Sequence, residues 1–267
     1  MLMPSLSGVN STFNVIAAAI GAIIIMIYKI SILKGAKTMD ERFSRSARIF
    51  GTDNQEKLEN TKVIVFGLGG VGGAVCEALA RSGIGTLGLV DKDTVDITNI
   101  NRQLIATEST IGMKKTDACE KRLVEINPNI KLIKHDLFYL PETADQINLL
   151  EYDYIVDAID NVTAKLELIK RAEKENVKII SSMGTGNKIH PEMLEIADIN
   201  KTSVCPLARV IRRELRNKGI NHLTVVYSKE EPQNLDGDRT PASSTFVPVS
   251  AGVLIASKVV QDILEIK

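Results

Sequence analysis

The chain has 267 residues, enough for one large domain or for one domain with appended segments. Basic and acidic side chains number 33 each, which excludes a globally basic protein and confines any nucleic-acid contact to a local face. Three separated cysteines (Cys76, Cys119 and Cys205) and three histidines, without a C-x-x-C pair, predict a reducing, cytoplasmic context and no zinc site.

The N-terminal segment is strongly apolar. Residues 15–28 form an unbroken apolar run, and no charged side chain precedes Lys29. A membrane span needs about 20 residues, a length that residues 14–33 reach if the Lys29 side chain extends to the membrane surface. Two interpretations of residues 1–38 stay open. They form a single membrane anchor that leaves the rest of the chain in the cytoplasm, or they are not part of the working protein and Met39 is its true start.

Beyond residue 60 the hydrophobic pattern alternates between strand-like and helix-like segments. Strands are expected at 62–66, 86–91, 131–135, 153–158, 178–182 and 222–227. Helices are expected at 71–82, 114–126, 163–175, 206–217 and 249–265. Such alternation is typical of an α/β, Rossmann-like, doubly wound fold with a mainly parallel sheet and helices on both faces. We expect residues 39–267 to form this domain, with the apolar segment 249–265 as a core helix rather than a membrane span.

One stretch, KVIVFGLGGVGGAV, reads as a strand, a glycine-rich turn and the start of a helix. It contains the pattern G-x-G-x-x-G, formed by Gly67, Gly69 and Gly72, and Gly70 lies within the same turn as a further candidate for binding the nucleotide. The first glycine permits the tight turn, the second the close approach of a phosphate, and the third close packing of helix against strand. The free N–H groups at the helix start favour an anion. Asp91 ends the next strand, where a ribose-binding carboxylate is expected.

The residues that follow decide which nucleotide is bound. The glycine turn alone favours NAD by frequency, and an NAD(P)-dependent oxidoreductase is one alternative. Polar side chains gather after the strand that ends in Asp91, namely Asp93, Asn99, Arg102 and Gln103. Lys115 begins a later helix, and Asp157 and Asp160 follow a later strand. Arginine presents donors suited to phosphate, and Mg²⁺ takes one or two carboxylates together with phosphate oxygens. These polar residues together therefore predict binding of ATP and Mg²⁺. An enzyme that transfers a hydride would not need them.

Each of these residues also has a purely structural interpretation. Arg102 could form a surface ion pair, Lys115 could be a solvated helix residue, and Asp157 could form the turn at the strand end. Asp160, followed by Asn161, could belong to a helix cap. Their occurrence together, in this order, favours the nucleotide site over the separate structural roles.

These motifs resemble the ThiF-type adenylating family, to which the ubiquitin-activating enzymes belong. The matching stretches are GLGGVG, LVDKDTVDITNINRQ, GMKK and DAIDN, which together span roughly residues 42–190, over half of the chain. The family adenylates carboxylates with Mg·ATP. The resemblance therefore implies a ThiF-type fold and adenylation chemistry.

The resemblance also implies a role for individual residues. Asp91 is expected to bind the ribose, and Asp160 is expected to bind Mg²⁺. The triphosphate is expected to contact Asn99, Arg102 and Lys115. The family forms homodimers in which an N-terminal arginine, here Arg45, reaches the triphosphate bound by the partner subunit.

The C-terminal part, residues 200–267, is expected to contact the substrate and to distinguish the branches of the family. Members that activate sulfur-carrier proteins usually carry paired C-x-x-C zinc ligands, which this chain lacks. The stretches ADINKTSVCPLARVIRRELRNKGI, VVYSKEEP and FVPVSAGVLIASKVV resemble the tRNA threonylcarbamoyladenosine dehydratase branch. That resemblance implies a tRNA substrate whose modified adenosine, beside the anticodon, is activated at its carboxylate and closed into a ring with loss of water. Adenylation of the C-terminus of a ubiquitin-like or sulfur-carrier protein is the alternative.

The helix expected at 206–217 carries arginines on one face, at the spacing i, i+3 and i+7, namely Arg209, Arg212 and Arg216. They form either a stripe for the tRNA backbone or a solvated face balanced by Glu214. Cys205 precedes this helix. It is either a reactive thiol at a helix N-terminus or a small buried side chain, and we favour the second interpretation because ring closure needs no thioester.

Overall fold

The computed structural model describes residue 20, residues 40–233 and residues 241–266. The chain divides into two compact units, Met1–Ser44 and Arg45–Lys267. The short 3-10 helix η1 (Glu41–Phe43) belongs to the first unit. The predicted anchor at 14–33, apart from residue 20, lies outside the described residues, and so do the predicted boundary after residue 38 and the alternative start at Met39.

A seven-stranded sheet in the order β3-β2-β1-β4-β5-β7-β6 forms the centre of the second unit. All neighbouring strands are parallel except β6 and β7, which are antiparallel. The chain winds outwards from β1 in both directions, which confirms the predicted doubly wound α/β fold. The strands are β1 (Lys62–Phe66), β2 (Thr86–Val90), β3 (Lys131–His135), β4 (Tyr154–Asp157), β5 (Lys178–Ser182), β6 (Leu194–Asp198) and β7 (Thr224–Ser228).

Helices connect the strands. The α-helices are α2 (Ser44–Phe50), α3 (Thr52–Glu59), α4 (Gly70–Arg81), α5 (Lys115–Ile126), α6 (Val162–Glu175), α7 (Pro206–Asn217) and α8 (Phe246–Leu264). The remaining 3-10 turns are η2 (Ile97–Asn99), η3 (Glu108–Thr110), η4 (Ala144–Gln146), η5 (Leu149–Glu151), η6 (Pro191–Met193) and η7 (Ile199–Lys201). Gly83 follows α4 with a positive φ of 88°, as expected of a glycine just beyond a helix end.

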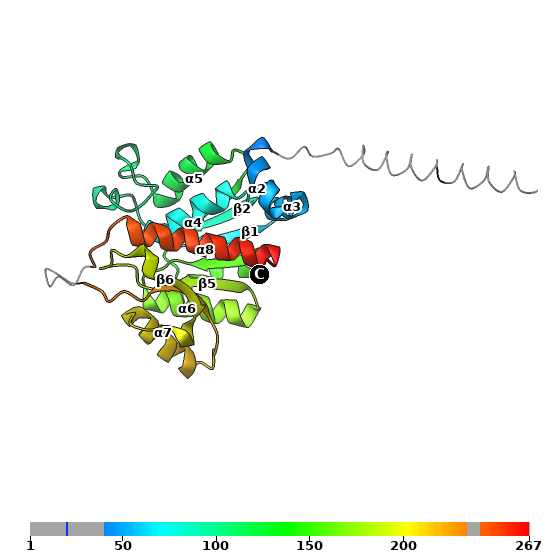
Figure 1. The fold of residues 1–267 in the computed structure, drawn as a ribbon. Helices are drawn as coiled ribbons and strands as arrows, with labels where there is room; N and C mark the ends of the chain where they lie inside the picture. Colours follow the sequence, from blue (N-terminus) through cyan, green and yellow to red (C-terminus); the bar gives the residue numbers. More distant parts are fainter. Residues whose placement is uncertain (1–19, 21–39, 234–240, 267) are drawn as a thin grey trace, which may run out of the picture. The chain divides into compact units, whose positions relative to one another are not determined.

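The helices cover both faces of the sheet, as predicted. Successive residues of a strand point to opposite faces, so Val63 and Val65 of β1 join one hydrophobic cluster, and Ile64 and Phe66 join another. The first cluster includes residues of α3, α4, α5 and α8, whereas α6 packs on the opposite face together with α7. Figure 1 shows α8 running beside α4 across the first face.

The strand β6 was not predicted. Its sequence LEIAD mixes apolar and acidic residues, and all five residues are only partly buried, because β6 pairs with β7 alone at the edge of the sheet. Edge strands lack the continuous apolar runs that identify central parallel strands. The helix α3 was not predicted either, since its one buried apolar residue, Leu58, gives no periodic signal. The predicted helices differ from the observed ones by a residue or so at their ends, except that α8 begins at Phe246 rather than 249.

The helix α8 is a core helix, as predicted. Among the described residues it is the only helix long and apolar enough to cross a membrane by length and composition, and half of that apolar stretch is buried inside the protein. Its inner face packs against α4, where Gly252 meets the backbone of Val71: a Cβ at this position would lie 2.5 Å from the Val71 carbonyl oxygen. This close contact explains why α8 follows the sheet rather than standing free.

Candidate active site

A pocket of about 420 Å³ opens at the carboxyl edge of the central strands. Its walls are the segments that follow β1, β2, β3, β4 and β5, including Gly67, residues 69–70, 91–93, 137–139 and 158–160, and Thr185. The sheet order reverses between β1 and β4, and open α/β sheets bind their ligands in the crevice at such a switch point. The volume is within the range of small-molecule sites.

The pocket brings together most of the residues predicted for nucleotide binding. Ten of them line it: Gly67, Gly69, Gly70, Asp91, Asp93, Asn99, Arg102, Gln103, Lys115 and Asp160. They come from five segments that are up to about 90 residues apart in sequence, so the fold rather than local sequence assembles them. Of the predicted glycines, Gly72 alone is absent from the lining, because it packs inside the turn.

The glycine turn has the predicted geometry. Gly67 has a φ of 86°, which side chains rarely permit, and a Cβ on Gly72 would lie 1.7 Å from the Gly67 carbonyl oxygen. Gly69 is open towards the pocket, since a Cβ there would meet only the amide nitrogen of Gln103, at 4.0 Å. No side chain caps the start of α4, so its first N–H groups are available to an anion.

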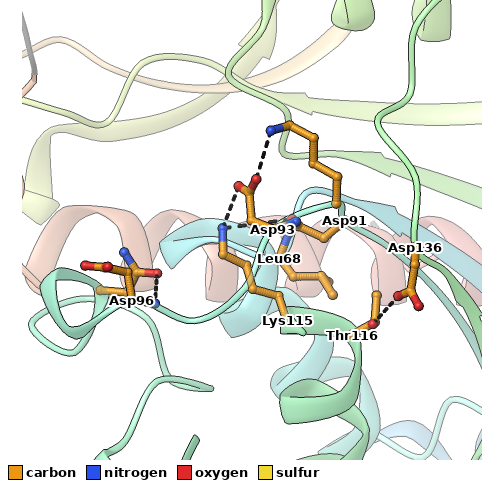
Figure 2. A network of polar contacts seen from close by, with 9 residues as sticks. Leu68, Asp91, Asp93, Asp96, Lys115, Thr116 and Asp136 are labelled. Carbon is orange, nitrogen blue, oxygen red and sulfur yellow. Dashed lines mark hydrogen bonds and ion pairs between the residues drawn. The ribbon is translucent and has the colours of Figure 1, made fainter. Parts of the chain in front are cut away.

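An acid–lysine network joins the segment after β2 to the start of α5. Figure 2 shows Lys115 extending from α5 to Asp93, with Nζ and Oδ2 3.0 Å apart. Lys115 is 9% exposed at its side chain and lies 3.9 Å from Asp91 Oδ1. Asp91 also accepts hydrogen bonds from the backbone N–H groups of Leu68 and Asp93, at 2.7 and 2.8 Å. The predicted ribose ligand therefore also fixes the glycine turn.

The two lysines beside Asp93 control its charge. Burial raises the pKa of Asp93, but the hydrogen bonds and charges of Lys92 and Lys115 outweigh burial, so the pKa lies below its ordinary value. The carboxylate is therefore ionised at neutral pH, and both lysines are held in place at the pocket wall.

The loop after η2 supplies the polar side chains on another wall. Arg102 Nη1 donates to the Thr98 carbonyl oxygen at 2.8 Å and to Asn101 Oδ1 at 3.0 Å. Asn99 closes the turn by accepting a hydrogen bond from a backbone N–H. The Gln103 side chain is buried, and its Oε1 has no hydrogen-bond partner among the described residues. An unpaired buried amide beside a pocket is a group that a ligand can satisfy.

The two acids after β4 have different environments. Asp157 is fully buried, with its Oδ2 2.7 Å from Lys165 Nζ, and does not line the pocket. Asp160 lines the pocket, and within the described residues no side chain forms a hydrogen bond or ion pair with its carboxylate. The residues alone left both acids as candidate Mg²⁺ ligands, and the family resemblance assigned the metal to Asp160. Of these two acids, Asp160 is the one that lines the pocket.

Several pocket residues were missed by sequence analysis. After β3, an apolar wall contains Leu137, Phe138 and Tyr139, and Lys92 Nζ lies 4.9 Å from the centre of the Phe138 ring. The C-terminal part of the chain also contributes Ser243 and Pro248 to the lining of the pocket. The signal that could have identified the segment after β3 is its position, because every strand of the predicted sheet ends at the same edge.

The predicted arginine stripe on α7 is divided by the structure. Arg212 is half-buried, and its Nη1 donates to the carbonyl oxygens of Ile199 and Thr202 and to Thr202 Oγ1, at 3.2, 3.0 and 2.6 Å. Arg209 and Arg216 are exposed. Arg212 thus fixes the turn that precedes α7, and Arg216 Nη2 donates to Asn200 Oδ1 of the same turn at 3.3 Å.

Two further predicted residues lie away from the pocket. Arg45 is exposed on α2 and does not line the pocket of its own chain. Cys205 is free and 3% exposed, packed in the cluster beneath α7. Cys76 and Cys119 are free and buried as well. Burial raises the pKa of the Cys76 thiol well above its ordinary value. All three thiols therefore occupy packing positions.

The arrangement suits a ligand with both an anionic and an apolar part. The start of α4, Arg102 and Lys115 offer donors to phosphate, whereas Phe138 and its neighbours offer an apolar surface to a base. Within the described residues no group of three or more His, Cys, Asp or Glu side chains could hold a metal ion alone. Mg²⁺ bound to phosphates needs only one or two carboxylates, so Asp160 suffices for such a site.

Comparison with known proteins extends these observations. The ThiF family model matches residues 43–264. The chain is 41% identical over 244 residues to the tRNA threonylcarbamoyladenosine dehydratase of Bacillus subtilis, covering 85% of this chain and 96% of the relative. It is 34% identical over 258 residues to the Haemophilus influenzae protein of that name, covering 89% and 99%. The solved structure of E. coli TcdA, the same dehydratase, in complex with ATP superposes with a TM-score of 0.79 at 30% identity, covering 84% of this chain and 94% of that chain.

The position of Lys115 makes it the sharpest test of the pocket. We expect Lys115→Ala to weaken the binding of Mg·ATP about 10- to 100-fold, because a hydrogen bond to a charged group contributes roughly 1.5–3 kcal/mol. Isothermal titration calorimetry measures the change. The matched control is Lys114→Ala, which removes an exposed surface pair with Asp136 and should change the affinity by less than about twofold. Equal effects of the two variants would place the phosphates elsewhere.

Proposed function

This chain belongs to the ThiF family, and we propose that it is an enzyme that dehydrates threonylcarbamoyladenosine in tRNA in an ATP-dependent reaction. The observation that carries the proposal is the extent of the likeness. The alignment covers 85% of this chain and 96% of the Bacillus subtilis relative, so it includes at least part of residues 200–267, which we expect to distinguish the branches of the family. The predicted ATP-binding residues meet in one pocket, which supports ATP as the activating group.

The first step is adenylation. A carboxylate oxygen of the modified adenosine attacks the α-phosphorus of ATP, the bond from that phosphorus to the bridging oxygen breaks, and pyrophosphate leaves. Negative charge develops on the transferred and departing phosphates. We assign its stabilisation to Arg102 and Lys115, together with the free N–H groups at the start of α4. Asn99 and Gln103 add neutral hydrogen-bonding groups at the same wall.

The second step closes the ring. A nucleophilic atom within the modified adenosine attacks the carbonyl carbon of the acyl adenylate, and the bond from that carbon to the AMP oxygen breaks. The nucleophile loses its proton, and AMP departs with the oxygen that came from the carboxylate. The net change in the nucleoside is the loss of one water. An internal nucleophile needs no enzyme thioester, which agrees with the burial of Cys205.

We propose that Asp160 is the protein ligand of Mg²⁺. The residue fits this role because its carboxylate lines the pocket and is unpaired within the described residues. The metal would neutralise phosphate charge as pyrophosphate leaves. Asp91 and Asp93 are less suited, since hydrogen bonds and lysines already occupy their oxygens.

We propose that the substrate tRNA contacts α7. The exposed arginines of this helix are Arg209, Arg213 and Arg216, and the exposed Lys218 follows the helix end. Phosphate contacts of this kind supply affinity without reading sequence. Because tRNA is a cytoplasmic substrate, the domain 39–267 would act in the cytoplasm under either interpretation of residues 14–33.

Adenylation of a ubiquitin-like or sulfur-carrier protein tail remains the second candidate, because it would use the same ATP pocket. What favours tRNA is the extent of the likeness to the dehydratases: the alignments cover 85% and 89% of this chain and 96% and 99% of the two relatives. A carrier protein would also place an extended peptide at the pocket rather than a polyanion at α7.

Mass spectrometry of digested tRNA tests the proposal. After incubation of the full chain with Mg·ATP and tRNA that carries threonylcarbamoyladenosine, we expect the modified nucleoside to lose the mass of one water, and only in the presence of ATP. Lys115→Ala should slow the loss about 100-fold or more, as expected when a group that stabilises the transition state is removed. No mass change with a folded, ATP-binding chain would direct attention to carrier proteins.

The α7 surface is tested by the triple substitution Arg209→Ala, Arg213→Ala and Arg216→Ala. We expect weaker tRNA binding and a salt dependence, log K against log salt concentration, that is shallower by about two to three, since each lost phosphate contact removes roughly one. ATP binding should not change. The control combines Arg81→Ala with Lys121→Ala, on helices that cover the other face of the sheet. A loss of the same size in the control would remove α7 as the contact.

We also propose a homodimer in which Arg45 contacts the phosphates bound by the partner subunit. The exposed apolar residues Ile97, Ile100 and Ile111, in the loop between β2 and α5, offer a surface for such a contact. We expect Arg45→Ala and Lys115→Ala to be inactive separately. Mixed and allowed to exchange, they should recover about one quarter of the wild-type activity, because half of the dimers are hybrid and each hybrid has one complete site. No recovery after proven exchange would contradict the shared site.

A further inference from the structure

A buried lysine lies at the ends of β4 and β5, the two strands that lead into adjacent walls of the pocket. Lys165, in the first turn of α6, is fully buried. Its ammonium group donates three hydrogen bonds, to Asp157 Oδ2 at 2.7 Å, to the Ser182 carbonyl oxygen at 2.9 Å and to Ser181 Oγ at 3.1 Å. Ser181 Oγ in turn donates to Asp157 Oδ2. Every N–H donor of the lysine is therefore used inside the protein.

The partners of Lys165 are the last residues of two neighbouring strands. Asp157 ends β4 and pairs with Ser181 in the parallel ladder, and Ser182 ends β5. The chain enters the pocket directly after each strand, through Ala158 to Asp160 on one side and Thr185 on the other. The ammonium group thus joins the starting points of two adjacent walls of the candidate site.

The segment that carries Asp160 is fixed at both of its ends. On one side, Asp157 Oδ1 accepts a hydrogen bond from the Ile159 N–H at 3.1 Å. On the other side, Asn161 caps α6 by accepting a hydrogen bond from the Ala164 N–H at 3.0 Å. The backbone of Asp160 lies between these two anchors, and the first anchor depends on the orientation that Lys165 gives to Asp157.

Stability alone does not explain this charged pair. A fully buried ion pair contributes little to stability compared with apolar side chains of similar volume, so a requirement for defined geometry explains the pair better than stability does. Three directional hydrogen bonds fix the end of β4 relative to the end of β5 more narrowly than apolar packing does. Fixed geometry matters most to a metal ligand, since residues that orient a ligand without touching the metal typically change metal affinity 10- to 100-fold.

We propose that Lys165 is a positioning residue, which holds the Asp160 segment so that the Asp160 carboxylate meets the metal of a bound Mg·ATP. This inference rests on the proposed function, because it assumes ATP and a divalent metal in the pocket. Lys165 does not contact the nucleotide itself, since it is fully buried and absent from the pocket lining. Its effect on the metal passes through Asp157 and the segment 158–160.

Isothermal titration calorimetry of the full chain with ATP tests the inference. Affinities are measured without metal, with Mg²⁺ and with Mn²⁺, and the quantity compared is the factor by which metal raises the affinity for ATP. We expect Lys165→Met to reduce that factor about tenfold or more, while the affinity for metal-free ATP stays as in the wild type. The matched control is Lys170→Met, the same substitution at an exposed position of α6, which should leave both affinities unchanged.

A second variant covers the case in which Lys165→Met does not fold, because that substitution leaves Asp157 buried and unpaired. In Asp157→Asn/Lys165→Met the cluster is neutral, and the Asn oxygen still accepts the Ile159 N–H. We expect this variant to fold, as judged by circular dichroism and thermal melting, and to show the same loss of the metal effect. A folded variant in which metal raises ATP affinity as in the wild type overturns the positioning role.

The titration contains no tRNA, so the two proposals fail separately. One outcome is that metal raises the ATP affinity of the wild type but not of the Lys165 variants, while the wild type does not dehydrate the nucleoside. That outcome supports the positioning role and contradicts the proposed substrate. A wild-type chain whose ATP affinity is the same with and without metal overturns the positioning role, whatever the outcome of the dehydration assay.

Discussion

The candidate site depends on a backbone contact that only glycine permits. Gly67 lies so close to the loop after β4 that a Cβ would be 2.7 Å from the Ala158 carbonyl oxygen, and Gly72 lies closer still to Gly67, since a Cβ there would be 1.7 Å from the Gly67 carbonyl oxygen. This contact places the start of α4 and the loop that carries Asp160 at the same point, where the sheet order reverses. A side chain at either glycine would separate them. The anion-binding end of α4 and the predicted metal ligand would then no longer face one pocket.

Charge in the pocket is arranged before any ligand enters. Lys115 is held by Asp93, so its position is fixed and its rotamer freedom is largely lost in advance, which lowers the entropic cost of binding a phosphate. Arg102 uses Nη1 for groups of its own loop, which orients the planar guanidinium while its other nitrogens have no partner among the described residues. Among the described residues that line the pocket, Asp160 presents a carboxylate without a hydrogen-bond or ion-pair partner. A triphosphate with a divalent cation complements this pattern, whereas a neutral ligand would leave the Arg102 guanidinium without a counter-charge.

Sequence analysis was most successful where the signal is local. The strand–turn–helix around Gly67 and the apolar runs of the central strands follow from periodicity and turn chemistry, and the parallel order follows from the alternation of elements. It failed where a residue's environment depends on distant segments. Nothing near Lys165 in sequence indicates that it is buried with Asp157, so the pattern of residues alone did not separate the two acids after β4, and only the family resemblance pointed to Asp160. The spacing of Arg212 gave its helix face correctly but not the backbone carbonyls that its guanidinium binds.

The loop that carries Arg102 and the C-terminal part of the domain, residues 200–267, are joined by direct contacts, and this bears on how the proposed site acquires a particular substrate. Asn101, beside Arg102, donates to the Ser243 carbonyl oxygen at 2.9 Å, and Ser243 belongs to the segment that leads into α8. The first turn of α8 also packs on the first turn of α4, where a Cβ on Gly70 would lie 3.0 Å from the Pro248 side chain. The C-terminal segment is therefore part of the wall of the pocket in which we propose that the phosphates bind. Changes in this segment can alter which carboxylate reaches the α-phosphorus while the glycine turn, Lys115 and Asp160 stay in place.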